Sequence, residues 1–230
     1  MSNASVSAAP LVFDDLRTRR RMRLASGFAH HVSLRLNQIG ALLILLLLAP
    51  VMALVAWLIW RRDGAPIFFG HFRVGRDGEL FRCLKFRSMY RDADRMLQEL
   101  LQSDPQARAE WDKDQKLSRD PRITPVGHFL RKTSLDELPQ LFNVLRGEMS
   151  LVGPRPITTG ELTRYGAARW HYLSVQPGMT GLWQVSGRNN TTYDERVALD
   201  RRYVEARSFR LDLSILFRTV SVVLARDGAR

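Results

Sequence analysis

The stretch from Arg131 to Arg155 places two adjacent carboxylates between two arginines. Asp136 and Glu137 open an apolar stretch, so exposure to water alone does not explain them. Arginine is suited to planar, two-pronged contacts with phosphate. Carboxylates beside phosphate groups commonly share a Mg²⁺ ion, which binds one or two carboxylates together with phosphate oxygens. The pattern therefore indicates a site for a phosphate-rich substrate, with Asp136 as a nucleophile or a metal ligand.

A purely structural role for the two acids is the alternative. Ser134 and Glu137 have the spacing of a capping box, in which a hydroxyl and a carboxylate satisfy free amides at a helix start. Pro139 would then fall past the first turn and remove one helical hydrogen bond. With Asp136 as the cap, Pro139 stays within the first turn of a helix that reaches Leu145, and the helix dipole keeps the carboxylate ionised. Capping and catalysis do not exclude each other.

An uncharged apolar run precedes this region. Residues 39–60 contain no charged side chain and are numerous enough to span a bilayer. The run is too long and begins too late for a secretory signal, whereas a buried helix of a soluble protein remains an alternative. Counting about twenty residues to each side, the flanks hold five and four arginines, so both resemble cytoplasmic flanks. Pro50 divides the run into equal halves, which predicts a re-entrant helix–break–helix, with a single kinked span as the alternative.

Most of the net charge of +12 lies beside the apolar run. Residues 1–38 contribute +4 (six arginines, two aspartates), and residues 61–91 contribute +5 (seven arginines and one lysine against three acids). Such clusters attract anionic lipid head groups, and equally an anionic lipid substrate. Nucleic acid is the generic partner of a basic chain, but no nucleic-acid motif is present. The single cysteine, Cys83, excludes an intrachain disulfide and a zinc site of several thiolates, which fits a reducing, cytosolic setting.

The remaining elements follow from local patterns, and the predicted fold class is α+β and mostly helical. We expect a basic tail (1–34), a membrane helix broken at Pro50 (35–62) and a cytosolic domain with a small β-hairpin (63–230). The hairpin should turn at Gly75–Gly78. The last helix carries an apolar side that suits either a membrane surface or the domain core. Within the cytosolic domain we expect a polar helical excursion over 91–118, helices over 138–145, 158–173, 193–206 and 209–225, and a short strand within 175–190.

Long blocks of this sequence resemble a known family. They include RVGRDGELFRCLKFRSM, DPRITPVGHFLRKTSLDELPQLFNVLRGEMSLVGPRP and VQPGMTGLWQVSGRNN, together with the apolar run around Pro50. They are similar to the bacterial sugar transferases, polyprenyl-phosphate hexose-1-phosphate transferases that begin exopolysaccharide and O-antigen assembly. The resemblance covers about residues 35–226 and is to a short form, nearest to undecaprenyl-phosphate galactose phosphotransferases. Ala49 stands before Pro50 where relatives often carry serine, so no serine hydroxyl can satisfy the backbone at the break.

The resemblance implies a covalent mechanism at the inner membrane, with the catalytic domain facing the cytosol. Asp136 would attack the sugar-bearing phosphorus of a UDP-sugar, UDP-galactose first and UDP-glucose next, and expel UMP. Undecaprenyl phosphate would then take the phosphosugar, beside inner-membrane lipids and possible downstream glycosyltransferases. Glu137 would help Asp136 hold Mg²⁺. The phosphate-binding side chains that the resemblance implies are Lys85, Arg87, Arg131, Arg155 and Arg188.

Two other classes of function use the same features. A membrane-anchored scaffold of a polysaccharide assembly would leave the acid pair unused. A phosphatase or nucleotidase acting on the same ligands would release free sugar phosphate or inorganic phosphate without a lipid-linked product. The intact Asp136–Glu137 pair argues against the scaffold, and the nature of the product separates the other two classes.

Overall fold

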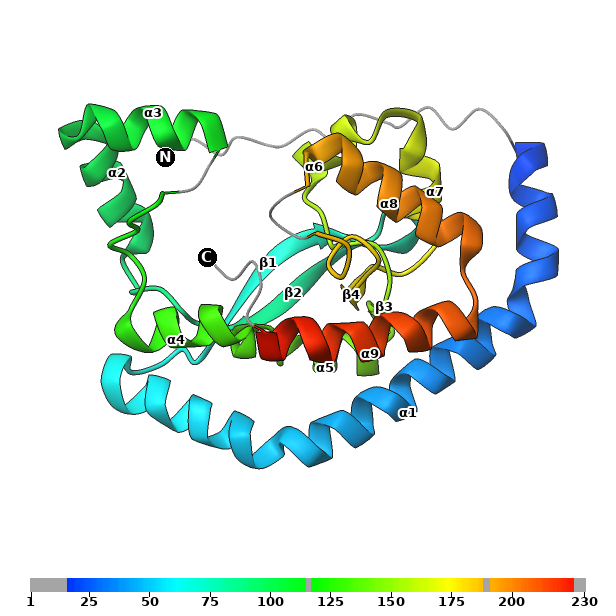
Figure 1. The fold of residues 1–230 in the computed structure, drawn as a ribbon, viewed down its shortest axis with the longest axis horizontal. Helices are drawn as coiled ribbons and strands as arrows, with labels where there is room; N and C mark the ends of the chain where they lie inside the picture. Colours follow the sequence, from blue (N-terminus) through cyan, green and yellow to red (C-terminus); the bar gives the residue numbers. More distant parts are fainter. Residues whose placement is uncertain (1–15, 115–116, 188–190, 226–230) are drawn as a thin grey trace, which may run out of the picture. The chain divides into compact units, whose positions relative to one another are not determined.

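The computed structural model describes residues 16–114, 117–187 and 191–225 (Figure 1). The chain divides into two compact units, Met1–Leu36 and Asn37–Arg230, and helix α1 begins in the first and continues in the second. The described part is mostly helical with two small sheets, as the predicted fold class requires. The helices and strands are α1 (Leu16–Asp63), β1 (Phe68–Val74), η1 (Arg76–Gly78), β2 (Leu80–Phe86), α2 (Ala93–Ser103), α3 (Pro105–Asp114), α4 (Pro125–Thr133), η2 (Leu135–Glu137), α5 (Gln140–Leu145), β3 (Ser150–Val152), α6 (Thr159–Arg164), η3 (Gly166–Ala168), α7 (Arg169–Leu173), β4 (Gly178–Thr180), α8 (Tyr193–Ala206) and α9 (Phe209–Ala225).

Beyond Leu36, helix α1 has one buried face and one exposed apolar face. Ala41, Met52, Val55 and Ile59 are buried against the domain, at spacings close to whole helical turns. His31–Asp63 is long and apolar enough to cross a membrane. Its most apolar stretch of 18 residues has a mean hydropathy of 2.9, and only 17% of that stretch is buried. The exposed large side chains of this helix after Leu36 are Ile39, Leu42, Leu43, Leu46, Leu47, Val51, Leu54, Trp57 and Trp60.

Helix α1 is continuous through Pro50, which differs from the predicted interruption. The helix changes direction in its light-blue to cyan part (Figure 1), and a proline inside a helix commonly produces such a bend. Packing on both sides of Pro50 explains the continuity. Ala41 before the proline belongs to one buried cluster, and Met52 and Val55 after it belong to another.

Both ends of the apolar part of α1 are hydrogen-bonded to the same domain. At one end, Asn37 Oδ1 accepts from the backbone amide of Leu151 (2.7 Å), and Gln38 Nε2 donates to the Leu145 carbonyl (2.9 Å). At the other end, Arg87 Nη2 donates to the carbonyls of Asp63 (3.0 Å) and Gly64 (2.8 Å). The helix is therefore fastened along the domain rather than attached to it at one end.

The predicted hairpin is confirmed as strands β1 and β2. Their antiparallel register pairs Phe68 with Phe86 and Val74 with Leu80. The turn follows Gly75, whose amide donates to the Glu79 carbonyl (2.7 Å). Asp77 and Gly78 both have positive φ angles, 56° and 87°, which is a conformation that Asp tolerates and Gly favours.

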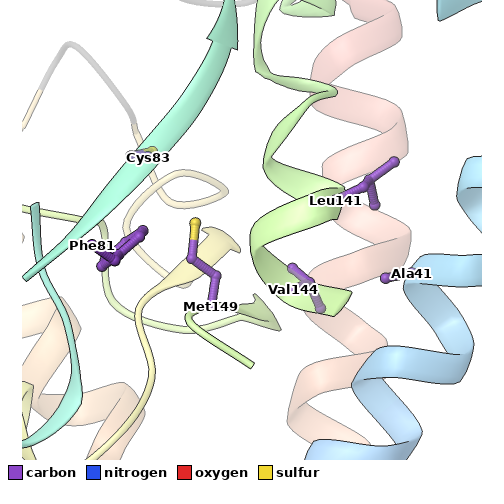
Figure 2. Close-up of a cluster of buried hydrophobic side chains, with 6 residues drawn as sticks. All are labelled: Ala41, Phe81, Cys83, Leu141, Val144 and Met149. Atoms are coloured by element: carbon purple, nitrogen blue, oxygen red, sulfur yellow. The ribbon is translucent and has the colours of Figure 1, made fainter. Parts of the chain in front are cut away.

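A buried cluster joins the hairpin to α5 and α1 (Figure 2). Phe81 and Cys83 come from β2, Leu141 and Val144 from α5, and Ala41 from α1. The thiol of Cys83 is buried there. Because α5 directly follows the acid pair, this packing fixes the distance between β2 and the two carboxylates.

Several other predicted elements are confirmed. The excursion over 91–118 contains α2 and α3, which stand away from the hairpin (Figure 1), and the two C-terminal helices are α8 and α9. The short strand is β4, which pairs in parallel with β3. Helix α9 is apolar on two sides, because Ile215 is fully buried while Phe209 and Phe217 are about 70% exposed.

Candidate active site

The acid pair lies in a single 3-10 turn between two helices. Ser134 ends α4 in the left-handed region (φ 56°), η2 carries Asp136 and Glu137, and α5 begins at Gln140 after Pro139. The capping prediction is therefore wrong, because Asp136 is inside η2 and no side chain caps α5. The left-handed residue turns the chain so that Asp136 points into the domain, where its side chain is buried.

Lys85 of β2 binds both carboxylates. Its Nζ lies 2.7 Å from Glu137 Oε1 and 3.9 Å from Asp136 Oδ2. The structure thus brings together three of the residues that the sequence pointed to. The lysine also supplies one of the positive charges that an anionic substrate needs beside an anionic nucleophile.

Burial dominates the electrostatics of Asp136. Loss of solvent raises its pKa to about 6, the nearby Lys85 ammonium lowers it, the Glu137 charge raises it further, and Arg131 lowers it. The sequence predicted a carboxylate held ionised by a helix dipole. Instead, the ionised form is disfavoured by burial and retained at neutral pH only because two cations lie near it.

Arg131 of α4 is held near the acid pair by Ser88, which lies two residues after the end of β2. Its Nε donates to Ser88 Oγ (2.9 Å), and the charges of Asp136 and Asp120 oppose the lowering of its pKa by burial. Helix α4 can approach this closely because position 127 is glycine. A Cβ at Gly127 would lie 1.9 Å from the Ser88 carbonyl oxygen.

The other predicted phosphate-binding residues have different contacts. Arg87 is buried, and its Nη2 donates to the carbonyls of Asp63 and Gly64 at the end of α1. Arg155 lies with its Cζ 5.5 Å from the centre of the Trp183 ring. Arg188 lies outside the described residues. Phosphate binding by Arg87 and Arg155 stays a prediction, and the contacts of Arg87 with backbone carbonyls are ones that no side-chain pattern reveals.

The segment that carries Arg155 is held by tyrosine hydroxyls. The Tyr203 hydroxyl donates to the Val152 carbonyl (3.1 Å), and the Tyr172 hydroxyl accepts from the Ile157 amide (3.2 Å). Both tyrosines are buried. The Tyr203 hydroxyl also lies 2.7 Å from Asp212 Oδ1. The sequence reveals none of this, because the tyrosines lie in later helices and their partners in this segment are backbone atoms.

Asn143 is a positioning residue that the sequence analysis missed. Its side chain sits on the free edge of β2, where Oδ1 accepts from the Leu84 amide (3.0 Å) and Nδ2 donates to the Arg82 carbonyl (2.8 Å). The amide thereby takes the place of a third strand and fastens α5 to β2. An asparagine among the apolar residues Leu141, Phe142, Val144 and Leu145 is the signal in the sequence that could have identified it, because a polar side chain on a buried helix needs hydrogen-bond partners.

The acid pair has the donor set that Mg²⁺ prefers when it also binds phosphate, namely one or two carboxylates. Among the described residues, no group of three or more His, Cys, Asp or Glu side chains could hold a metal ion. A magnesium ion held by Asp136 and Glu137 would therefore take its other ligands from phosphate and water. These residues fit such an ion, which would supply additional positive charge at the substrate phosphates.

A buried aspartate and a half-buried glutamate lie beside a lysine and an arginine, on a domain fastened along an apolar helix. This arrangement is typical of enzymes that transfer groups from phosphate esters. Comparison with known proteins agrees with this class. The model of the bacterial sugar transferase family matches residues 29–226. The chain belongs to this family.

Curated relatives give the comparison more detail. The chain is 55% identical to the UDP-galactose-lipid carrier transferase of Erwinia amylovora, over 90% of this chain and 44% of the relative. It is 58% identical to the undecaprenyl-phosphate galactose phosphotransferase of Salmonella typhimurium, over 82% and 40%. The exopolysaccharide production protein ExoY of Sinorhizobium fredii is 51% identical over 82% of this chain and 84% of its own length. The chain thus spans less than half the length of the first two relatives and most of the third.

Proposed function

We propose that this protein transfers hexose-1-phosphate from a UDP-sugar to undecaprenyl phosphate and releases UMP, the step that begins exopolysaccharide or O-antigen assembly. The buried Asp136 beside Lys85 and Arg131 is the observation that carries the proposal. A partly desolvated carboxylate between two cations is suited to attack on an anionic phosphorus.

In the first half of the reaction, an Asp136 carboxylate oxygen forms a bond to the sugar-bearing phosphorus. The bond from that phosphorus to the bridging oxygen breaks, and its electron pair leaves with UMP. Lys85 and Arg131 offset the repulsion between the carboxylate and the diphosphate. The hexose-1-phosphate remains on Asp136 as an acyl phosphate.

In the second half, an oxygen of undecaprenyl phosphate attacks the same phosphorus. The bond to Asp136 breaks, the carboxylate is regenerated, and the product is undecaprenyl diphosphate hexose. Glu137 stays paired with Lys85 and, together with Asp136, would hold a Mg²⁺ ion at the phosphates. Splitting the transfer into two displacements lets one carboxylate serve both the soluble and the lipid substrate.

Galactose is the sugar that we propose first. Two relatives named for galactose, from Erwinia and Salmonella, are more than half identical to this chain. An undecaprenyl-phosphate glucose phosphotransferase of Komagataeibacter xylinus is 41% identical, which makes glucose the next candidate.

The membrane placement that we propose is re-entrant, in the cytoplasmic membrane with the domain on the cytosolic face. Asn37 and Gln38 at one end of the apolar helix, and Asp63 and Gly64 at the other, bind the same polar domain. A helix that crossed the bilayer would separate its two ends by a hydrocarbon core of roughly 30 Å, so one domain on one face could not bind both.

The test is UMP release from UDP-galactose and UDP-glucose by the full chain in detergent, with Mg²⁺, with and without undecaprenyl phosphate. We expect multiple turnovers only with the lipid, and a fall of roughly a thousandfold or more in Asp136→Asn. Labelled hexose-1-phosphate should appear on the wild-type protein when the lipid is withheld. Asp94→Asn, an exposed carboxylate of α2, is the matched control and should retain full activity.

Three results would contradict the proposal. Free sugar phosphate or inorganic phosphate without a lipid-linked product would identify a hydrolase. Transfer at the wild-type rate by Asp136→Asn would show that Asp136 is not the nucleophile. Polysaccharide formation in cells that carry only Asp136→Asn would favour a scaffold role.

A further inference from the structure

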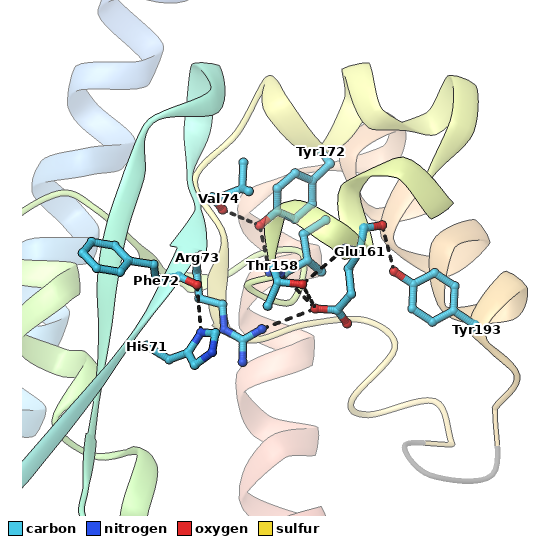
Figure 3. Close-up of polar contacts among 9 residues, drawn as sticks. His71, Phe72, Arg73, Val74, Thr158, Glu161, Tyr172 and Tyr193 are labelled. Carbon is cyan, nitrogen blue, oxygen red and sulfur yellow. Dashed lines mark hydrogen bonds and ion pairs between the residues drawn. The ribbon is translucent and has the colours of Figure 1, made fainter. Parts of the chain in front are cut away.

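A second positively charged cluster lies on the hairpin and around Trp183. Arg73 of β1 places Nη1 3.3 Å from Glu161 Oε2 (Figure 3). The Cζ atoms of Arg155 and Arg196 lie 5.5 Å and 4.4 Å from the centre of the same Trp183 ring. We call Arg73, Arg155, Arg196 and Trp183 the arginine cluster.

The arginine cluster has more positive charge than the chain itself neutralises. Among the described residues, no carboxylate forms an ion pair with Arg155 or Arg196. Within the part of the chain that the structure describes, the Nε of Arg196 and the Nε1 of Trp183 are buried without a hydrogen-bond partner. Asp200 is a buried acid whose carboxylate accepts from the Tyr165 hydroxyl (2.8 Å), and burial raises its pKa to about 7 although the charges of Arg196 and Arg155 lower it. Partly buried like charges held side by side are unfavourable unless an anion joins them.

The hairpin relates the arginine cluster to the acid pair. Arg73 pairs with Phe81, and Lys85 lies four residues further along β2 on the same face, about 13 Å away at the usual rise of a strand. Cys83 lies between them on β2. The charges of Lys85, Glu137, Arg73 and Arg155 all act on the pKa of its thiol, so each lies within electrostatic range of it. The arginine cluster and the acid pair therefore lie along one face of the hairpin. An extended nucleoside diphosphate is long enough to contact both.

We propose that the arginine cluster binds the nucleotide end of the UDP-sugar, the part that leaves as UMP. Arg73, Arg155 and Arg196 would bind the nucleotide phosphate, while Lys85 and Arg131 bind the phosphate that carries the sugar. This division assigns a role to Arg73, Arg196 and Trp183, and it rests on the proposed function.

The test is the binding of UMP to the full chain in nanodiscs, measured by calorimetry. Arg196→Met should raise the Kd for UMP roughly tenfold or more, because a charge-assisted contact to phosphate is lost. Arg201→Met is the matched control on the same helix, since Arg201 is exposed and its Nε donates to Glu205 (2.7 Å). The control should leave the Kd unchanged. In turnover, Arg196→Met should raise the KM for UDP-galactose and leave the KM for undecaprenyl phosphate unchanged.

A second variant separates a loss of UMP binding from a failure to fold. Arg73→Met should also weaken UMP binding roughly tenfold while its thermal unfolding stays cooperative. Wild-type affinity for UMP in both Arg196→Met and Arg73→Met would overturn the assignment, and so would a rise only in the KM for undecaprenyl phosphate, which would identify a lipid phosphate site. If the wild type binds UMP with these dependences but releases none from any UDP-hexose, the assignment stands and the proposed function fails. If the wild type releases UMP from a UDP-hexose and both variants bind UMP with wild-type affinity, the proposed function stands and the assignment of the arginine cluster fails.

Discussion

At the scale of the residue, the burial of Asp136 would serve the proposed reaction and opposes the fold. A desolvated carboxylate lacks the shell of water that slows its attack on phosphorus. The same desolvation raises its pKa to about 6, from an ordinary value of 3.8. Lys85 and Arg131 lower that pKa and Glu137 raises it. The three neighbours thus set the pH at which the nucleophile becomes available.

This balance predicts a pH profile for the first half of the reaction. The rate of UMP release in a single turnover should rise about tenfold per pH unit below pH 6 and level off above it, because only the ionised carboxylate attacks. Glu137→Gln should move the rising limb to lower pH, since the Glu137 charge raises the pKa of Asp136. Lys85→Met should move it to higher pH, since the lysine lowers that pKa. Rapid-quench measurements between pH 4.5 and about 8 check the direction of both shifts. If the rising limb falls at the same pH in the wild type, Glu137→Gln and Lys85→Met, these neighbours do not set the pKa of Asp136.

The same pKa makes a prediction about stability. The native state holds a proton on Asp136 more tightly than the unfolded state, so the penalty of ionisation is absent below about pH 4 and fully present above about pH 6. Asp136→Asn should therefore increase the free energy of unfolding by up to about 3 kcal/mol at pH 8, and the gain should vanish as the pH falls towards 4. Unfolding in detergent at both pH values measures the difference, with Asp94→Asn as the control. A less stable Asp136→Asn at pH 8 would contradict the prediction.

At the scale of the element, two close contacts hold the helices that flank the acid pair. Asn143 fastens α5 to the edge of β2 through two backbone hydrogen bonds. Gly127 lets α4 approach the Ser88 carbonyl, which places Arg131 within hydrogen-bonding distance of Ser88 Oγ. The geometry of the site therefore depends on contacts between segments that are far apart along the chain.

We expect Gly127→Ala to abolish most of the activity. A Cβ would lie 1.9 Å from the Ser88 carbonyl oxygen, so α4 must move away and carry Arg131 with it. The loss should be roughly a hundredfold in kcat/KM, because a displacement of about 1 Å at a charged substrate contact has effects of this size. Gly160→Ala in α6 is the matched control, since its Cβ would meet nothing within 4 Å. Equal activity of the two variants, measured as UMP release, would show that the close approach is not needed.

The sequence predicts the local elements well and the site only in part. The hairpin with its Gly75–Gly78 turn and the helices α8 and α9 follow from patterns that are complete within each segment. The environment of Asp136 does not, because Lys85 lies 52 residues away from Glu137 along the chain and burial depends on packing. The contacts of Arg87 with Asp63 and Gly64 escape any pattern for the same reason.

At the scale of the whole molecule, the exposed face of α1 extends the apolar surface of the domain. Leu43, Leu46 and Leu47 of α1 are exposed, as are Phe209 and Phe217 of α9. Such surfaces are stable when lipid covers them. The acid pair lies on a domain fastened along this helix, which suits transfer to a substrate whose hydrocarbon remains in the bilayer.

Cysteine labelling tests the re-entrant placement in cells. In a Cys83→Ala background, Leu36→Cys and Arg62→Cys place single thiols at the two exposed ends of the apolar helix. We expect a membrane-impermeant maleimide to label neither in intact spheroplasts and both after permeabilisation, because both ends lie on the cytosolic side. Leu47→Cys, in the exposed middle of the helix, is the control and should stay unlabelled in both conditions. Labelling of Leu36→Cys in intact spheroplasts would identify a single span.

The fastening of α1 at both ends also has a consequence for the order of folding. The partners of Asn37 and Gln38 lie 114 and 107 residues later in the chain, whereas Arg87 lies only 24 residues after Asp63. Closing a long loop costs more entropy and takes longer than closing a short one. During synthesis, the C-terminal end of α1 can therefore bind Arg87 early. The end of its apolar part at Asn37 and Gln38 must wait until residue 151 has left the ribosome. In the placement that we propose, the helix would therefore enter the lipid before the domain that finally holds it exists.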